Sequence, residues 1–242
     1  MVTLLEPVNF IDIHTHILPG VDDGARDLAE SLLIIEEAIE VGVKEIILAP
    51  HLLCNGVNLD KISQCFKSFG EAVAQRGLGV KLHLGPELML SFELPESIGA
   101  DKRLTIKGDG LYALIEMPSF EIPVYAPDVF FGLLTRGVTP ILAHPERCLD
   151  VVRDYRQVSS FVNNGVMIQI NAGSILGKYG RKVRSASISL IKAGLCHIVA
   201  SDTHRSGVIN TLLPEAFSFL EKTIGNARTV EMVYSNPAKL VR

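Results

Sequence analysis

Several features that would assign this 242-residue chain to a common protein class are missing from it. No apolar run reaches the roughly 20 residues that a transmembrane helix needs, and the first nine residues lack the basic segment of a signal peptide. The formal net charge is −4, so no basic excess is present to neutralise the phosphates of a nucleic acid. We therefore expect a protein that neither inserts into a membrane nor binds nucleic acid.

Cysteine motifs are also missing. Cys54, Cys65, Cys148 and Cys196 lie far apart and form no Cys-x-x-Cys pair, which is typical of buried, reduced thiols in a cytoplasmic protein. None is followed by arginine six residues later. The sequence therefore excludes the Cys-x5-Arg loop, in which a thiolate attacks phosphotyrosine.

What the chain does contain is an alternation of apolar, β-branched runs with amphipathic segments. This order predicts parallel strands joined by helices and closed into a barrel, with an open doubly wound sheet as the alternative. Asp27, with Glu30 three residues later, is expected to cap the first helix. No linker divides the chain, so one domain is expected over residues 1–242, with the irregular segment 93–110 as a loop over the barrel mouth. Strands are predicted at residues 9–13, 45–49, 80–84, 112–115, 139–143, 166–170 and 197–200, and helices at residues 28–41, 59–76, 127–136, 153–163, 183–193 and 212–224.

His14 and His16 follow the first apolar run and are the most informative residues of the chain. Alternate side chains of an extended chain point to the same side, so both imidazoles can contact one metal ion. Packing or solvation on a strand is the ordinary explanation of such a pair. The rest of the sequence favours the metal.

Metal-ligating residues stand at the ends of most other predicted strands, where parallel barrels have their active sites. Unpaired imidazoles and carboxylates would be costly to bury there, and a metal cluster relieves that cost. The candidate ligands are His14, His16, His51, Glu87, Glu116, His144, Asp202 and His204. This set exceeds what one ion takes, so two or three ions with a bridging carboxylate are expected. Mixed nitrogen and oxygen ligands suit Mn²⁺, Fe²⁺ or Zn²⁺.

Other residues of these types have ordinary explanations. The sixth strand ends in Asn171 instead of a metal ligand, and His83 and His197 lie away from the strand ends, so we interpret both histidines as structural. A small basic stretch follows the sixth strand and is interpreted as a solvated helix start, with contact to an acidic phosphopeptide as the alternative. It consists of Lys178, Arg181, Lys182 and Arg184.

Five sequence blocks resemble the bacterial manganese-dependent protein tyrosine phosphatases of capsule and exopolysaccharide gene clusters, which belong to the PHP superfamily. The blocks are residues 12–16 (DIHTH) with 22–24 (DDG), 112–116 (YALIE), 140–147 (PILAHPER), 169–171 (QIN) and 199–204 (VASDTH). The resemblance implies a distorted seven-stranded βα barrel, with a trinuclear Mn²⁺ cluster at the C-terminal rim of the strands. It also implies a phosphotyrosine protein as substrate, namely the tail of a bacterial tyrosine kinase that controls polysaccharide export.

By the same resemblance, each candidate ligand has a place. His14 and His16 would hold one ion with Glu87 and Asp202, and Glu87 would bridge to a second ion held by Glu116 and His144. The third ion would be held by His51 and His204, with help from the turn at Asp22 and Asp23. Two departures from the family pattern are Leu52 and Leu53, where some relatives have basic residues, and an N-terminal extension at residues 1–10. The extension is expected to pack on the closed end of the barrel or against another subunit of an oligomer.

Without a suitable cysteine, water must be the nucleophile, and metal ions make this feasible by lowering the pKa of bound water to give hydroxide. Arg147 is the candidate for a forked hydrogen bond to the phosphoryl oxygens; a salt bridge to Glu146 or Asp150 is the alternative. Asp23 is the candidate proton donor, or simply a turn residue.

Three other functions compete with a tyrosine phosphatase. The first is a small-molecule phosphatase of the histidinol phosphate type on the same scaffold, against which the DDG turn and Glu116 speak. The second is a carbon–nitrogen hydrolase of the amidohydrolase type, which usually has a lysine at a central strand end, where this chain has none. The third is a non-catalytic PHP interaction module, which would be expected to lose ligands that this chain keeps.

Overall fold

The computed structural model describes residues 9–52 and 58–242, in which strands and helices alternate along the chain. Asp27 caps the first helix as predicted, since its carboxylate accepts a hydrogen bond from the backbone N–H of Glu30 at 2.9 Å. The strands are β1 (Phe10–Thr15), β2 (Val43–Leu48), β3 (Lys81–Leu84), β4 (Glu87–Met89), β5 (Tyr112–Glu116), β6 (Thr139–Ala143), β7 (Met167–Asn171) and β8 (Ile198–Ala200). The helices are α1 (Leu28–Glu40), α2 (Leu59–Gln75), α3 (Leu94–Ala100), α4 (Ala126–Thr135), α5 (Leu149–Arg153), α6 (Ser159–Asn163), α7 (Ala172–Ile175), α8 (Arg181–Lys192), α9 (Ile209–Ile224), α10 (Asn226–Val230) and α11 (Pro237–Val241).

The strands form two parallel sheets, which confirms the α/β class. One sheet has the order β1-β2-β3 and the other the order β4-β5-β6-β7-β8. The predicted seven-stranded barrel is not confirmed, because the described residues give eight strands and no closed hydrogen-bonded barrel. The difference arises at Gly85 and Pro86, where the chain leaves β2 and joins β5; proline has no N–H to donate to a ladder. Isolated bridges join Thr15 to Thr203 and His51 to Glu87 where the two sheets meet.

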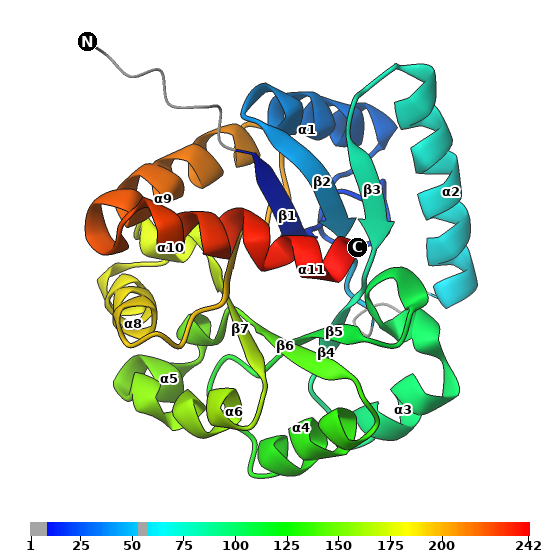
Figure 1. Ribbon diagram of the computed structural model, residues 1–242. Helices are drawn as coiled ribbons and strands as arrows, with labels where there is room; N and C mark the ends of the chain where they lie inside the picture. The colour runs from blue at the N-terminus through cyan, green and yellow to red at the C-terminus, as the bar shows by residue number, and fades with distance from the viewer. Residues whose placement is uncertain (1–8, 53–57) are drawn as a thin grey trace.

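Helices surround the strands in Figure 1 and cover their outer side, while the inner side faces the side chains of the other strands. Alternate strand residues such as Ala113 and Ile115 belong to the large core under the helices, while Leu114 belongs to a smaller inner core. Burial on both sides explains the nearly continuous apolar runs in the sequence. The inner core consists of Ile11, Ile13, Ile47, Ala49, Ile106, Leu114, Ile141, Ala143, Ile198, Ala200, Ala238 and Leu240.

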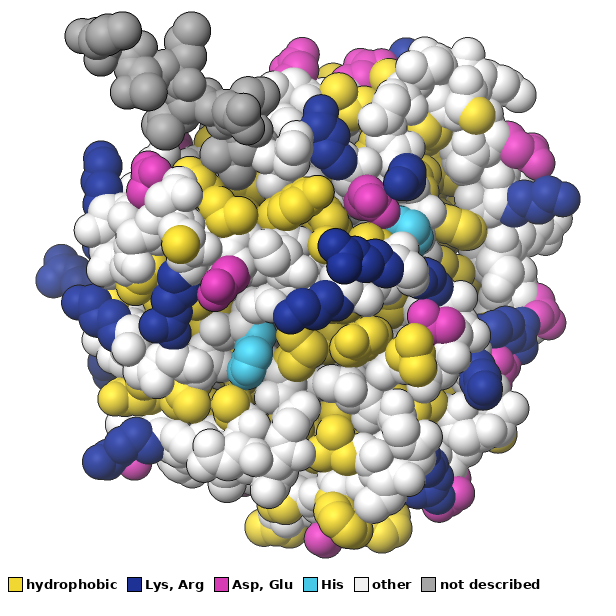
Figure 2. Space-filling view, in the orientation of Figure 1, with side chains coloured by type: hydrophobic (Ala, Val, Ile, Leu, Met, Phe, Trp, Pro, Cys, Tyr) yellow, Lys and Arg dark blue, Asp and Glu magenta, His cyan; other side chains and the backbone are white. Residues whose placement is uncertain are grey.

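The C-terminal helix α11 covers one end of this inner core. It crosses the front of the strands in Figure 1, and the Asn236 side chain just before it donates to the carbonyl of His197, directly before β8, at 2.9 Å. The covered end is therefore the N-terminal end of the strands. Figure 2, in the same orientation, shows basic side chains spread among hydrophobic patches on this face. Seven of the eight predicted ligands lie at or just after the opposite, C-terminal ends of strands, and Glu87 lies between the end of β3 and the body of β4, as the first residue of β4.

Three predicted elements are wrong in detail. The segment 93–110 is no simple loop, because it contains α3 and two 3₁₀ turns, Lys102–Leu104 (η1) and Ile106–Gly108 (η2), of which η2 puts Ile106 in the inner core. The helix expected at 153–163 is divided into the end of α5, a 3₁₀ turn at Tyr155–Val158 (η4) and α6. Helix α9 begins at Ile209, ahead of the predicted residue 212.

The remaining expectations from sequence concern the burial of the cysteines and several residues that lie outside the described ranges. Cys148 and Cys196 are buried as expected, whereas Cys65 is half-buried. Cys54 and Leu53, and residues 1–8 of the N-terminal extension, lie outside the described residues. Among the helices that the structure describes, none has the length and apolarity required to cross a bilayer.

Candidate metal centre

The Glu87 carboxylate lies at the centre of a group of imidazoles. Its Oε2 atom is 3.2 Å from Nε2 of His14, 3.4 Å from Nε2 of His16 and 3.1 Å from Nδ1 of His51. Its Oε1 atom is 2.9 Å from Nε2 of His144. Four histidines from three different strand ends thus meet one buried glutamate. Glu87 was expected to follow the third strand, and it does follow β3, but it is also the first residue of the additional strand β4.

Asp202 brings the end of β8 to the same place. Its Oδ1 atom lies 3.6 Å from Nε2 of His14, 3.5 Å from Nε2 of His16 and 3.6 Å from Nδ1 of His204. Glu116 approaches from β5, with Oε1 3.7 Å from Nδ1 of His51. The structure therefore brings all eight predicted ligands together.

Within this assembly, ligand atoms gather in three groups, each with all its atoms within 4.8 Å of one another. The groups share His16, His51 and Glu87, and of these only the Glu87 carboxylate has two oxygens with which it would serve two ions, as expected of the bridging carboxylate. Their members are His14, His16 and Glu87; His51, Glu87 and Glu116; and His16, Asp23, His51 and His204.

Two buried atoms at the centre have no hydrogen-bond partner among the described residues. They are Oε2 of Glu87 and Nδ1 of His51, and they face each other across 3.1 Å. Leaving buried polar atoms unsatisfied is costly. A divalent cation accepts lone pairs from both kinds of atom, so the residues present fit a metal.

The electrostatics of the centre also favour a cation. Burial would lower the pKa of His14, but the negative charges of Glu87 and Asp202 outweigh it and raise the pKa to about 9. Burial is likewise overcome at His16, whose pKa is raised to about 10 by hydrogen bonds to Asp22 and Glu87 and by the nearby carboxylates. The carboxylates around these two imidazoles therefore favour positive charge at the centre, although the Nε2 atoms of His14 and His16 lie 3.1 Å apart and share one hydrogen position.

Two of the candidate ligands have strained backbones. His144 has φ 32° and ψ 50°, and Asp202 has φ 55°, in the left-handed region that residues other than glycine rarely occupy. Such strain is found mostly at functional sites, where the surrounding structure compensates for it. Here it turns the chain sharply just after β6 and β8, where both side chains reach the cluster.

The turn after β1 gives its two aspartates different environments. Asp22 accepts a hydrogen bond from His16 at Nδ1 (2.8 Å) and one from the backbone N–H of His51 (3.1 Å), and the pKa of Asp22 falls to about 2 because these hydrogen bonds outweigh its burial. Asp23 points the other way, with Oδ1 3.6 Å from Nε2 of both His51 and His204. Asp22 thus orients a ligand, while Asp23 lies among the ligands.

Glycine is required at position 24 for this turn to approach β1. A Cβ atom on Gly24 would lie 1.8 Å from the backbone oxygen of His16, far inside any permitted contact. The close approach is fixed by a hydrogen bond from the N–H of Ala25 to the same oxygen at 2.9 Å.

Sequence reasoning assigned no role to Gln169 or Asn171, which connect two ligands from behind. His14 donates from Nδ1 to the Gln169 side chain (2.9 Å), which donates to Asn171 (2.8 Å), which donates to Oδ2 of Asp202 (2.6 Å). Because these hydrogen bonds fix Nδ1 of His14, Nε2 of the same ring is directed at the cluster. Two buried polar side chains in the otherwise apolar strand β7 were the available signal.

Arg147 lies at the edge of the centre. Its Nη1 atom donates to Oδ2 of Asp202 at 3.1 Å, and neither predicted alternative partner holds it. Glu146 accepts from the backbone N–H of Asn171, and Asp150 pairs with Arg153. A small cavity of about 30 Å³ opens beside the guanidinium, lined in part by Glu116, Ser119, His144 and Arg147.

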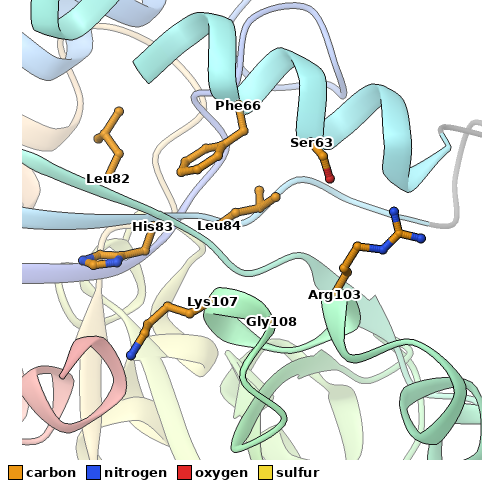
Figure 3. A pocket seen from close by; sticks show the side chains of 8 residues that line it. All are labelled: Ser63, Phe66, Leu82, His83, Leu84, Arg103, Lys107 and Gly108. Atoms are coloured by element: carbon orange, nitrogen blue, oxygen red, sulfur yellow. The ribbon is translucent and has the colours of Figure 1, made fainter. Parts of the chain in front are cut away.

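The two histidines interpreted as structural have partners outside the cluster. His83 lies 2.8 Å from Glu45, and Nδ1 of His197 accepts from the backbone N–H of Ile168 at 3.0 Å. His83 borders a separate cavity of about 350 Å³, which α2, β3 and the 3₁₀ turns η1 and η2 line (Figure 3). The cations at this cavity are already paired, Arg103 with Asp60 and Asp101 and Lys107 with Asp109.

The basic stretch after β7 matches its ordinary explanation. Arg181 and Lys182 begin α8. Arg184 donates to the carbonyl of Ile175 at 3.0 Å and lies over the ring of Phe219.

Comparison with known proteins identifies the family. A family model described as capsular polysaccharide synthesis, CpsB/CapC, matches residues 10–242. The chain belongs to the CpsB/CapC family. This CpsB/CapC chain is 34% identical over 196 residues to a putative tyrosine-protein phosphatase CapC of Staphylococcus aureus, covering 80% of this chain and 76% of that protein. The resemblance predicted from sequence is therefore confirmed.

Solved structures agree at the level of the fold. The CpsB/CapC chain matches a crystal structure from a study of YwqE of Bacillus subtilis and CpsB of Streptococcus pneumoniae, which that study describes as unique metal-dependent tyrosine phosphatases. The TM-score is 0.87 and the sequence identity 32%, and the match covers 96% of this chain and 94% of the other. A β-aspartyl dipeptidase of Fervidobacterium islandicum matches with a TM-score of 0.64 at 16% identity, covering 96% of this chain and 72% of that one. The second likeness shows a shared fold alone.

Proposed function

We propose that this chain is a metal-dependent protein tyrosine phosphatase. The observation that carries the proposal is the convergence of five imidazoles and three carboxylates at the C-terminal ends of the strands, next to an arginine and a cavity. Family membership and the names of the relatives support it. The proposed physiological substrate is a tyrosine-phosphorylated bacterial kinase of polysaccharide export.

Mn²⁺ is the proposed cofactor because the family resemblance implies it, and the imidazole nitrogens and carboxylate oxygens of the candidate ligands suit Mn²⁺ as they suit Fe²⁺ or Zn²⁺. The residues that would hold the ions are the eight predicted ligands, and Asp23 lies beside the group of His16, His51 and His204. Bound divalent cations supply two kinds of chemistry, acidifying a coordinated water and neutralising the charge of a phosphoryl group.

The remaining steps belong to side chains of this chain. Arg147 is placed to bind phosphoryl oxygens with the guanidinium edge that does not contact Asp202. The leaving phenolate has a pKa near 10, so proton donation assists its departure without being essential. Asp23 is the proposed donor or ordering group, since its side chain is 70% exposed and can reach both solvent and the cluster.

Binding of Mn²⁺ near neutral pH is expected to release at least one proton, because the pKa values of His14 and His16 are raised and their Nε2 atoms, 3.1 Å apart, must be free of hydrogen to become ligands. Both pKa values are raised above that of free histidine, so protons compete with the metal below those values. The apparent affinity for Mn²⁺ should rise with pH and level off above the pKa values of His14, about 9, and His16, about 10. Calorimetric titration in two buffers of different ionisation enthalpy measures the release. The control variant His83→Ala should release the same number of protons when it binds Mn²⁺. A binding enthalpy that does not depend on the buffer would contradict the expectation.

The function itself is tested by comparing substrates. Purified protein with Mn²⁺ is expected to hydrolyse p-nitrophenyl phosphate and a phosphotyrosine peptide, and to stop when EDTA removes the metal. A higher kcat/KM for histidinol phosphate than for the peptide would favour the small-molecule phosphatase instead. If none of the three phosphoesters were hydrolysed, the protein would be a non-catalytic module.

A further inference from the structure

Exposed apolar side chains stand near Arg147 in the chain segments that follow β5, β6 and β7. They are Phe120, Leu149 and Tyr179, which expose 75%, 42% and 43% of their surfaces, and we call them the apolar rim. Apolar side chains exposed together beside a cavity indicate a binding surface, whereas single ones scattered over a protein need no explanation.

Contacts between the loops make the apolar rim continuous with the candidate centre. The backbone N–H of Leu149 donates to the carbonyl of Ser119 at 2.9 Å, which joins the loops after β5 and β6. Ser119 lines the small cavity beside Arg147. On the other side, the Arg147 guanidinium lies 4.9 Å from the centre of the Tyr179 ring. The rim thus adjoins the place where a phosphoryl group is expected.

The position of the rim indicates what it meets. A phosphotyrosine bound at Arg147 carries its neighbouring residues about 3.3 Å further with each residue of extended peptide. Leu149 is two residues from Arg147, so their Cα atoms are at most about 7.6 Å apart. The residues beside the phosphotyrosine therefore fall within reach of the rim.

Charge and burial favour apolar neighbours in that peptide. An apolar side chain placed against Phe120 and Leu149 removes apolar surface from water on both partners. An acidic side chain would gain no such burial, and it would approach Glu121 and Asp150, which directly follow the two rim residues in sequence.

We propose that the apolar rim binds apolar side chains next to the phosphotyrosine of a polypeptide substrate. This inference rests on the function proposed above. The occupant is a substrate peptide and not a second copy of this chain, because a second copy seated on the rim would obstruct the approach to Arg147. The rim thereby selects phosphorylated polypeptides with apolar flanks over acidic ones and over small phosphoesters.

The test compares two phosphotyrosine peptides that differ only in having leucine or aspartate on both sides of the phosphotyrosine. For the wild type with Mn²⁺, kcat/KM should be about tenfold higher for the leucine peptide. In Phe120→Ser, kcat/KM for the leucine peptide divided by kcat/KM for p-nitrophenyl phosphate should fall by about tenfold. The matched control is Phe131→Ser on α4, which removes an aromatic side chain with 69% exposure away from the rim, and it should leave that ratio unchanged.

Each result decides between explanations. A ratio unchanged in Phe120→Ser, or a preference for the aspartate peptide, would overturn the rim proposal and leave the phosphatase function standing. Inactivity of the wild type on every phosphoester would overturn both. Sedimentation measurements on the wild type and Phe120→Ser add a third outcome, since a dimer that dissociates on substitution would make the rim a contact between copies.

Discussion

Replacing Glu87 with glutamine is expected to remove most of the bound metal and to lower phosphotyrosine hydrolysis by about a thousandfold or more. Glutamine keeps the shape of the side chain but removes the charge that four imidazoles surround at 2.9–3.4 Å. Cations at such centres are worth several kcal/mol in the transition state, and about 4 kcal/mol corresponds to a thousandfold in rate. Metal content by mass spectrometry and kcat/KM for p-nitrophenyl phosphate measure the two effects.

The chain offers a matched control in Glu45→Gln. Glu45 also faces an imidazole, with 2.8 Å between its carboxylate and His83, but that pair lies outside the cluster. This variant should keep full metal content and activity. Thermal unfolding of both variants with the metal removed separates loss of metal from loss of fold. Full activity of Glu87→Gln with metal bound would contradict the assignment of Glu87 as the shared ligand.

The ligand set was predictable because two simple periodicities fix it. Alternation along a strand places His14 and His16 on one side, and the parallel βα order brings all strand ends to one edge. Neither rule depends on which strands are neighbours. Local sequence was therefore enough to select the eight residues that the structure brings together.

Features that depend on strand neighbours could not be predicted. Gly85 and Pro86 mark the end of the predicted strand at 80–84, but nothing local shows that the chain resumes at Glu87 as a strand of the other sheet. Gln169 reaches His14 across 155 positions of sequence, and only the order of β7, β8 and β1 in space creates that contact. The different environments of Asp22 and Asp23 are likewise set by the turn geometry around Gly24.

Arg147→Ala is expected to lower kcat/KM by about a hundredfold while the metal stays bound. One preorganised hydrogen-bond donor to a developing negative charge is worth about this much, and Arg147 offers a guanidinium that is 40% exposed and held at one edge by Asp202. Arg147→Lys keeps the charge without the planar fork, so about a tenfold loss is expected. Inhibition by inorganic phosphate should weaken in the same order, since phosphate uses the same donors.

Because Arg147 also contacts Asp202, its effect on phosphate must be separated from an effect on the metal. Metal content and the inhibition constant of phosphate, measured on the same samples, do this. Arg153→Ala is the control, because Arg153 is 72% exposed and pairs with Asp150, away from the cluster. If Arg147→Ala lost metal in proportion to its activity, the arginine would serve to hold Asp202 in place. If phosphate inhibition alone weakened, Arg147 would bind the phosphoryl group directly, as its position between the cluster and the apolar rim favours.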